Sequence, residues 1–272
     1  MKKDMIYLFI AVALNLSIAA QEWYIPKPEL DKRRYFMVGV NLQYTANSDM
    51  VLEISRLENY YYASYSPVDR LNLYSGIPIV YASREKFDNN LNIVKRTATG
   101  IGDLFSQVSY ETFFGDDWKI IYNLDILLAT GRNPYDNDVG LGNGHNTVGI
   151  GQNYIKIIDP VALFAYIGYQ YSFAETYSIG KIKPGDDFRF KLGTSISLNP
   201  KVRSSFYVSG DIILDTKVDN KKVIASFANL IRFGWGLNWD RSAEWKINMN
   251  GIFGMTKNTP DAVIVMGVTR VI

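Results

Sequence analysis

The sequence predicts an all-β fold, a transmembrane antiparallel β-barrel of about 12 strands of the outer-membrane type. Three observations carry this prediction. Apolar and polar residues alternate along the segments, short and long connections alternate along the chain, and aromatic residues cluster near the segment ends. Each of these is expected when strands cross a bilayer around a wet interior.

The alternation is clearest in residues 118–128 and 161–173. One face of these segments carries Trp118, Ile120, Tyr122, Leu124, Ile126, Leu128, Val161, Leu163, Ala165, Ile167, Tyr169, Tyr171 and Phe173. The other carries Lys119, Asn123, Asp125, Ala162, Tyr166, Gly168, Gln170 and Ser172. Successive side chains of a strand point to opposite faces, so one face is apolar and the other small or polar. This pattern is typical of a strand between lipid and lumen.

The same alternation predicts the remaining strands in order. They are expected at 35–44, 59–66, 71–83, 102–114, 118–128, 147–158, 161–173, 187–198, 205–214, 223–239, 243–255 and 262–272. Residues 45–58 are expected to be a loop or an extension of the flanking strands. Pro78 lacks a backbone donor, so its strand must contain a bulge or a local distortion.

The connections form two classes that alternate along the chain. Short ones are expected at 67–70, 115–117, 159–160, 199–202 and 240–242. Longer ones are expected at 45–58, 84–99, 131–146, 175–186, 216–222 and 257–261. An antiparallel barrel with both termini in the periplasm requires short turns on the periplasmic side and longer loops outside.

Aromatic residues lie where two interfacial girdles would be. Trp118, Trp239 and Trp245 are close to short turns, whereas Tyr44, Tyr81, Tyr171 and Phe173 are beside long loops. The alternative fold is a secreted β-sandwich or a soluble barrel, whose strands also alternate. A soluble fold gives no reason for an apolar outer face and aromatic belts on nearly every strand. The membrane barrel is therefore preferred.

The N-terminal residues predict export. Residues 1–20 have a basic start, an apolar stretch and a small-residue end, as in a cleaved signal peptide. Residues 21–34 are expected to be a periplasmic lead-in and residues 35–272 the barrel. No later run of about 20 apolar residues exists, which excludes transmembrane helices. We therefore expect the outer membrane of a Gram-negative bacterium, with lipid, a small-molecule permeant and the barrel-assembly machinery as partners.

Charge and cysteine content exclude several other classes. A formal net charge of +2 gives no electrostatic footprint for nucleic acid. The absence of cysteine removes a lipoprotein anchor, disulfides and cysteine-based metal sites. No cofactor and no metal are expected.

Charged residues on the polar faces would line the pore. They are Asp103, Glu111, Lys119, Asp125, Arg189, Lys191, Asp211, Asp215, Arg232 and Lys246. The first interpretation is that opposite charges pair across the lumen and hold the barrel's shape. The second is that the basic residues meet the acidic ones at a constriction that selects permeants by field and diameter.

A hydrolase is a further alternative, because outer-membrane hydrolases use a serine or an aspartate activated by histidine. The chain has one histidine, His145, in a glycine-rich loop, and no serine is adjacent in sequence. Ser106 and Ser109 remain open as spatial neighbours. A lone histidine in such a loop is more often a loop residue than a base, so no catalytic residue is predicted and the protein is not expected to be an enzyme.

Four motifs resemble those of the outer-membrane transporter family of the MetA pathway of phenol degradation. They are GIPIVYASRE at 76–85, GIGD at 100–103, LLATG at 127–131 and LGNGHNTVGIG at 141–151. Ala129 and the pair His145-Asn146 depart from the family's pattern. The resemblance implies a β-barrel channel that admits small, often aromatic or hydrophobic, compounds.

The glycines of these motifs lie where loops meet strands. Together with Asp103 and His145 they form the predicted mouth, namely Gly100, Gly102, Gly131, Gly140, Gly142 and Gly144. Glycine permits positive φ and close backbone approach, so these loops could fold into the mouth and narrow it. The alternative is ordinary turn chemistry.

The sequence thus predicts an outer-membrane channel for passive uptake of small molecules. The second hypothesis is a structural or secretion-associated barrel, plugged by its N-terminal segment or its loops. The third is an outer-membrane hydrolase.

Overall fold

The computed structural model describes residues 35–49, 52–87, 92–115, 117–137, 139–224 and 226–272. The predicted signal peptide and lead-in, residues 1–34, lie outside the described residues. Within the described part of the chain, no helix is long and apolar enough to cross a membrane.

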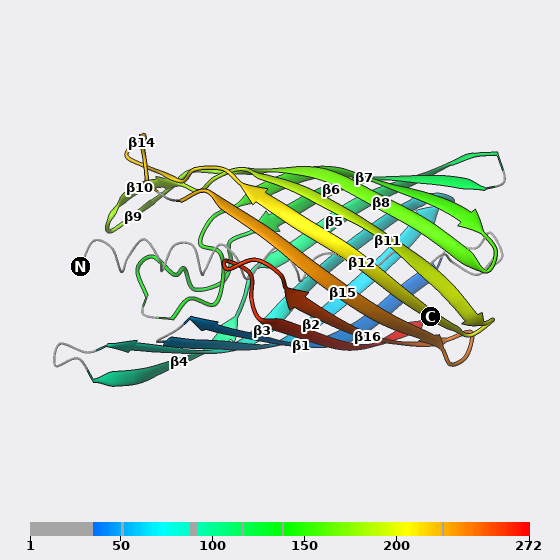
Figure 1. The fold of residues 1–272 in the computed structure, drawn as a ribbon, viewed down its shortest axis with the longest axis horizontal. Coiled ribbons are helices and arrows are strands. Elements are labelled where there is room, and N and C mark those ends of the chain that lie inside the picture. Colours follow the sequence, from blue (N-terminus) through cyan, green and yellow to red (C-terminus); the bar gives the residue numbers. More distant parts are fainter. Residues whose placement is uncertain (1–34, 50–51, 88–91, 116, 138, 225) are drawn as a thin grey trace.

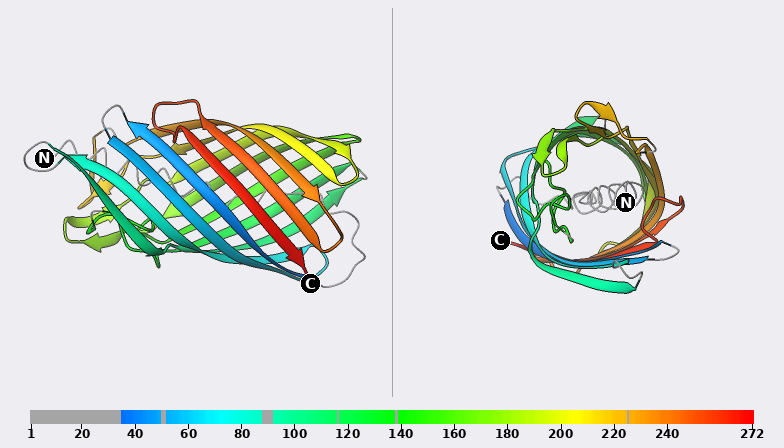
Figure 2. Two further views of the ribbon diagram at one scale, coloured as in Figure 1. Left: turned by 90° about the horizontal axis from the view of Figure 1, so that it is seen from below. Right: turned by 90° about the vertical axis from the view of Figure 1, so that its left-hand side faces the viewer.

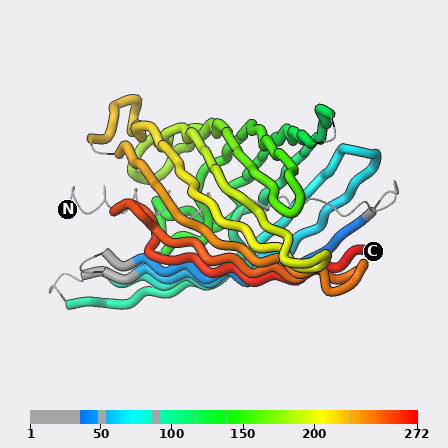
Figure 3. Tube along the Cα trace, turned by 45° about the vertical axis from the view of Figure 1, so that its right-hand side comes forward, coloured from blue at the N-terminus to red at the C-terminus, as the bar shows by residue number. Residues whose placement is uncertain are grey.

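Strands make up nearly all of the regular structure (Figure 1). The long strands are β1 (Tyr35–Asp49), β2 (Leu52–Val68), β3 (Leu71–Phe87), β4 (Ile93–Ile101), β5 (Leu104–Phe114), β6 (Trp118–Leu128), β7 (Thr147–Ile158), β8 (Val161–Ser172), β11 (Asp187–Asn199), β12 (Val202–Ile213), β15 (Ala228–Asp240), β16 (Trp245–Gly254) and β17 (Ala262–Val271). Figure 3 shows them running obliquely around the molecule.

These strands close into one barrel. Apart from β4 and β5, each pairs with its neighbours along the chain, and β17 pairs with β1 to complete the ring. β4 and β5 both pair with β3, β4 along residues 79–87 and β5 along residues 71–76, so they occupy one position in the wall. The 13-stranded sheet therefore forms a closed antiparallel barrel of twelve positions, as the sequence predicted.

Pro78 lies where the partner of β3 changes from β5 to β4. Its carbonyl accepts a hydrogen bond of 2.9 Å from the backbone N–H of Gly102, which lies in the gap between these two strands. The expected local distortion is therefore present. It falls at a break in the pairing, where the missing donor of proline costs no ladder hydrogen bond.

Residues 45–58 were expected to be a loop or an extension of the flanking strands, and the extension is correct, because β1 and β2 cover most of this stretch. Two other expected boundaries are wrong. β3 and β4 likewise cover most of the expected loop at 84–99, and the β3–β4 hairpin projects beyond the barrel (Figure 1). β15 begins at Ala228, five residues later than the expected start at 223. At residues 45–58 and 84–99, hydrogen bonding between long neighbouring strands continues beyond the apolar band of the barrel. The amino-acid composition does not reveal this continuation.

The outer loops contain a second, small sheet. It consists of β9 (Glu175–Tyr177), β10 (Gly180–Lys183), β13 (Lys217–Val218) and β14 (Lys221–Lys222). β10 pairs with both β9 and β13, so the expected loops at 175–186 and 216–222 are joined. This sheet lies at the same end as the β3–β4 hairpin (Figure 1).

The two faces of the wall are as predicted. Leu124, Ile126, Leu163 and Ile167 are exposed on the outside, as are the girdle residues Trp118, Trp239, Trp245, Tyr44, Tyr81, Tyr171 and Phe173. Within the strands, their neighbours in sequence are buried or half-buried on the inside. An unbroken apolar exterior matches the hydrocarbon of a bilayer.

Aromatic rings also lie on the inside, flat against glycines of neighbouring strands. Tyr62 covers Gly39, and Tyr60 covers Gly76. Tyr60, Tyr62, Tyr74 and Phe105 form a continuous row with ring centroids 5.3–6.4 Å apart. The absence of a Cβ lets each ring lie close to the wall, so the rings take little width from the lumen.

Candidate functional site

Residues 129–137 and 139–146, here called the inward segment, leave the wall after β6 and return to it at β7. In the end-on view of Figure 2 the green trace of this segment runs inside the ring of strands, against one side. Among the described residues it therefore occupies part of the cross-section of the lumen.

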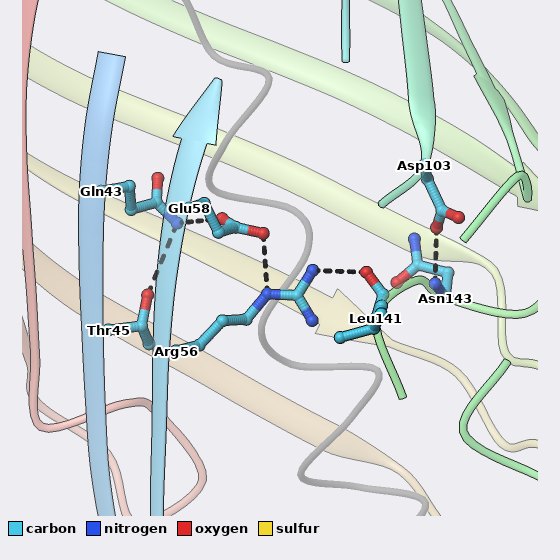
Figure 4. Close-up of polar contacts among 7 residues, drawn as sticks. All are labelled: Gln43, Thr45, Arg56, Glu58, Asp103, Leu141 and Asn143. Carbon is cyan, nitrogen blue, oxygen red and sulfur yellow. Dashed lines mark hydrogen bonds and ion pairs between the residues drawn. The ribbon is translucent and has the colours of Figure 1, made fainter. Parts of the chain in front are cut away.

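Asp103 anchors the inward segment to the wall. Its Oδ1 accepts a hydrogen bond of 2.9 Å from the backbone N–H of Gly131. Its Oδ2 accepts one of 2.5 Å from the backbone N–H of Asn143, which Figure 4 shows. Thr130 adds a hydroxyl hydrogen bond of 2.8 Å to the carbonyl of Gly102. One carboxylate thus holds both ends of the segment, and hydrogen bonds to an ionised acceptor are the stronger kind.

A second anchor comes from β2. Arg56 donates from Nη2 to the carbonyl of Leu141 at 2.8 Å and from Nε to Glu58 at 2.7 Å (Figure 4). Glu58 in turn accepts a hydrogen bond of 2.9 Å from the amide of Gln43 on β1. All three side chains are buried, so this polar chain fixes the direction of the guanidinium.

Apolar packing completes the attachment. Val139 and Leu141 of the inward segment pack against Val80, Ala82 and Ala98 on the inner faces of β3 and β4. Val80 and Leu141 are almost fully buried. The segment is therefore a packed part of the barrel, and this contact alone would stabilise it by a few kcal/mol, taking about 1.5–3 kcal/mol per buried aliphatic side chain.

The motif glycines lie where the inward segment packs against the wall. The backbones of Gly102, Gly131 and Gly142 are stacked so closely that a Cβ on Gly131 would lie 2.9 Å from Cα of Gly142 and 3.0 Å from the carbonyl carbon of Gly102. A methyl group on Gly142 would collide with Oδ1 of Asp103, and one on Gly100 would lie 2.9 Å from Cδ1 of Leu141. Close approach is the reason for glycine here. Among the six predicted mouth glycines, positive φ occurs only at Gly144 (78°).

The outer side of the inward segment is held by the small sheet. Tyr177 of β9 donates its hydroxyl to the carbonyl of Gly144, and its ring lies 4.5 Å from that of Tyr135. The backbone N–H of Ser178 donates to Asp136 at 3.0 Å. The inward segment is thus joined to the outer loops, and its role in narrowing the mouth stays a prediction.

The charged residues predicted to line the pore are distributed along the wall. Buried ones are Asp103, Glu111, Lys119, Arg189, Lys191, Asp211 and Arg232, and half-buried ones are Asp125, Asp215 and Lys246. Nine of these ten occupy inward-facing positions, and the tenth, Asp215, lies in the outer loops. Their role as pore lining stays a prediction.

Ion pairs run along the wall, whereas the sequence suggested pairs across the lumen. Lys119 on β6 contacts Glu111 on β5 at 2.6 Å, and Arg232 on β15 contacts Asp211 on β12 at 2.7 Å. Both are diagonal pairs between adjacent strands. The reason is reach, because side chains of adjacent strands are only about 4.8 Å apart at the backbone.

β11 carries a further polar group beside these pairs. Arg189 contacts Asp187 through Nε at 2.7 Å and donates from Nη2 to Gln170 on β8. On β6, which β8 and β7 separate from β11, Asp125 accepts a hydrogen bond of 2.8 Å from Gln107 on β5. The wall from β5 to β15 therefore presents a continuous polar belt.

Arg56, Glu58 and Gln43 were not among the predicted site residues. Arg56 and Glu58 lie in the stretch 45–58, whose structure the sequence left open. The signal was present, because Arg56, Glu58, Tyr60 and Tyr62 continue a period of two into β2. Extending the strand upstream would have placed both charges on the inner face.

His145 lies within the inward segment. It is buried, and its Nδ1 lies 3.1 Å from the carbonyl oxygen of Asn143. Of the two serines left open, Ser106 pairs with Ser75 at 2.9 Å, and neither contacts the histidine among the described hydrogen bonds. In the same described ranges, no group of three His, Cys, Asp or Glu side chains could hold a metal ion.

Comparisons with known proteins agree with this architecture. A model of the family described as "Putative MetA-pathway of phenol degradation" matches residues 31–264. The chain is similar to an outer membrane channel from Pseudomonas putida F1, with 13% identity, a TM-score of 0.71, and coverage of 91% of this chain and 100% of that one.

Two further solved structures share the fold. The NanC porin has 9% identity and a TM-score of 0.53 over 86% of this chain and 98% of its own. The translocator domain of the autotransporter NalP from Neisseria meningitidis has 11% identity and a TM-score of 0.53 over 89% of this chain and 90% of its own. At such identities the likeness is one of fold.

Proposed function

The chain belongs to the family of the MetA-pathway of phenol degradation, and we propose that it is an outer-membrane channel for the passive uptake of small molecules. The observation that carries this proposal is the inward segment. It is fixed inside a closed barrel by Asp103, Arg56 and apolar packing, so the lumen has a built constriction. A barrel with a purely structural role has no need of a fixed constriction.

The lining suggests the class of permeant. One side of the inner wall carries the aromatic row of Tyr60, Tyr62, Tyr74 and Phe105, and the other carries the polar belt from β5 to β15. A lumen with both surfaces suits small compounds that have an apolar, often aromatic, part and a polar group. The family name and the channel from Pseudomonas putida support the same class of function.

The exterior supports the location. A continuous apolar surface with tryptophans and tyrosines at its ends fits the outer membrane of a Gram-negative bacterium, reached through a cleaved signal peptide at residues 1–20. Membrane fractionation together with the N-terminal mass of the extracted protein tests this directly. Retention of residues 1–14 in the mature protein would contradict it.

Conductance in planar bilayers tests the channel function. Purified full-length protein should give discrete conductance steps in KCl, and liposomes that contain it should swell in small neutral solutes. Complete absence of both, for the native protein and for a variant with a shortened inward segment, would favour the second candidate. That candidate is a plugged structural or secretion-associated barrel, for which the similarity to an autotransporter translocator domain is the supporting observation.

A further inference from the structure

Arg232 lies in the barrel wall with one edge of its guanidinium unpaired among the described residues. It is 4% exposed, and its Nη1 contacts Asp211 at 2.7 Å. Within the part of the chain that the structure describes, its Nε and Nη2 have no hydrogen-bond partner. These two nitrogens form the side-on fork of arginine, whose parallel donors match the two oxygens of a carboxylate.

An unpaired buried donor is costly, roughly 1–3 kcal/mol and more when the group is charged. In the nearby Arg189 both donors of the fork are paired, because Nε donates to Asp187 and Nη2 donates to Gln170. In contrast, the fork of Arg232 is satisfied by none of the side chains described around it. Both nitrogens are enclosed by their neighbours, so a movement of these side chains would offer the edge to an anionic group of a ligand.

The row on which Arg232 lies is cationic. Lys191 on β11, Ser209 on β12 and Arg232 on β15 are register partners across three adjacent strands. Two positive charges therefore flank a serine, at about 5 Å per strand. Asp211 lies on the next row toward the outer loops and contacts Arg232 through Nη1, opposite the fork. The row can attract an anion without displacing this ion pair.

The next row toward the periplasmic turns is apolar. Phe164, Gly193, Tyr207, Gly234 and Ile252 are register partners across β8, β11, β12, β15 and β16. Tyr207, Ile252, Val263, Phe164 and Val265 form one apolar cluster. The ring of Tyr207 lies flat over Gly234, and Nζ of Lys191 is 5.2 Å from its centroid. The cationic row thus has an apolar, partly aromatic surface directly beside it.

We propose that these two rows form a binding site for small amphipathic carboxylates, such as an aromatic acid. The carboxylate takes the free fork of Arg232, with Lys191 adding attraction. The apolar body lies against Tyr207 and its cluster. This inference rests on the proposed channel function and assigns a substrate class to it.

Titration calorimetry on the detergent-solubilised full-length protein tests the site at low ionic strength. Sodium benzoate and benzyl alcohol are the probes, because they share a ring and differ in charge. Benzoate should bind at least about tenfold more tightly, since a charge-assisted hydrogen bond contributes about 1.5–3 kcal/mol. Equal affinity for the two probes would overturn the proposal, and this comparison requires no variant.

Variants locate the site. Arg232→Gln should weaken benzoate about tenfold and leave benzyl alcohol unchanged, while Arg232→Lys, which keeps the charge and loses the fork, should fall between. The matched control is Arg203→Gln, an arginine on the same pair of strands that contacts Asp240 at 2.6 Å near the periplasmic turns. It should bind benzoate as the native protein does. Native-like benzoate binding by a folded Arg232→Gln, judged by heat-modifiable gel mobility, would refute the assignment.

The site and the channel can fail separately. Benzoate binding without conductance in bilayers would keep the site and contradict the channel. Conductance without a preference for benzoate would keep the channel and overturn the site. If Arg232→Gln does not fold, Arg232→Lys decides, because equal binding by lysine and arginine would show that the fork has no role.

Discussion

At the scale of single residues, we expect the docking of the inward segment to depend on pH through His145. Its ring is buried in the inward segment, and this burial lowers the pKa of His145 from 6.5 to about 4, although the hydrogen bond to Asn143 opposes the shift. When the inward segment undocks from the wall, His145 regains its ordinary pKa. The undocked state therefore binds a proton more readily than the docked state. Docking should therefore be fully stable above pH 6.5 and weaken as the pH falls toward 4.

Hydrogen exchange measured by mass spectrometry checks this. Peptides that cover residues 129–146 should exchange faster at pH 4.5 than at pH 7, after correction for intrinsic rates. The difference between the two pKa values of His145 corresponds to a loss of up to roughly 3 kcal/mol of docking free energy. His145→Gln should abolish most of the difference. Asp103, Glu175 and Asp136 contact the same segment or its neighbours. If the pH effect persists in the glutamine variant, these carboxylates and not the histidine cause it.

At the scale of elements, the inward segment depends on glycine at one position above all. A methyl group at Gly142 would collide with Oδ1 of Asp103, so Gly142→Ala should cost roughly 1–3 kcal/mol of docking free energy, as overpacking does in a tight core. Release of the segment should widen the lumen and raise the single-channel conductance. Gly149→Ala is the control on the adjacent strand, because its nearest atom would be 3.4 Å away. Equal conductance of both variants would mean that the segment is not the constriction.

The same element shows the limit of sequence-based prediction. The motif glycines, Asp103 and His145 were correctly expected at the junctions of loops and strands, because composition and spacing are local. Their contacts are not local, since Asp103 meets Gly131 and Asn143 across 28 and 40 residues. Which residues face one another around a barrel depends on the stagger of all its strands. For this reason the direction of the segment was left open, and its second anchor, Arg56, was missed.

At the scale of the whole molecule, the strand faces follow from a period of two, and this made the barrel predictable. Leu124→Arg or Ile167→Arg should destabilise the folded barrel by roughly 2–4 kcal/mol, because each would place a charge on the lipid side near the middle of a strand. Asn123→Arg, which faces inward beside Leu124, should cost clearly less in urea unfolding from lipid vesicles. Gly168 is unsuitable as the inward control, since any side chain there would collide with Tyr166. Equal losses at positions 123 and 124 would reverse the assignment of inside and outside.

The balance of charge over the inner wall sets the ion selectivity. The inner wall carries four basic and four acidic residues on the same surface, namely Lys119, Arg189, Lys191, Arg232, Glu111, Asp125, Asp187 and Asp211. We therefore expect only a modest preference for anions or for cations. Replacing Arg189 and Lys191 together by Gln removes two positive charges and leaves Asp187 without its ion pair. The reversal potential in a KCl gradient should therefore shift toward cation selectivity, because salt screens charges inside a narrow, low-dielectric wall incompletely. The matched control is the double replacement of Lys221 and Lys222 by Gln, which removes the same charge from exposed residues of the outer sheet, where screening is effective. An equal shift in both double variants would show that the polar belt does not line the conducting path.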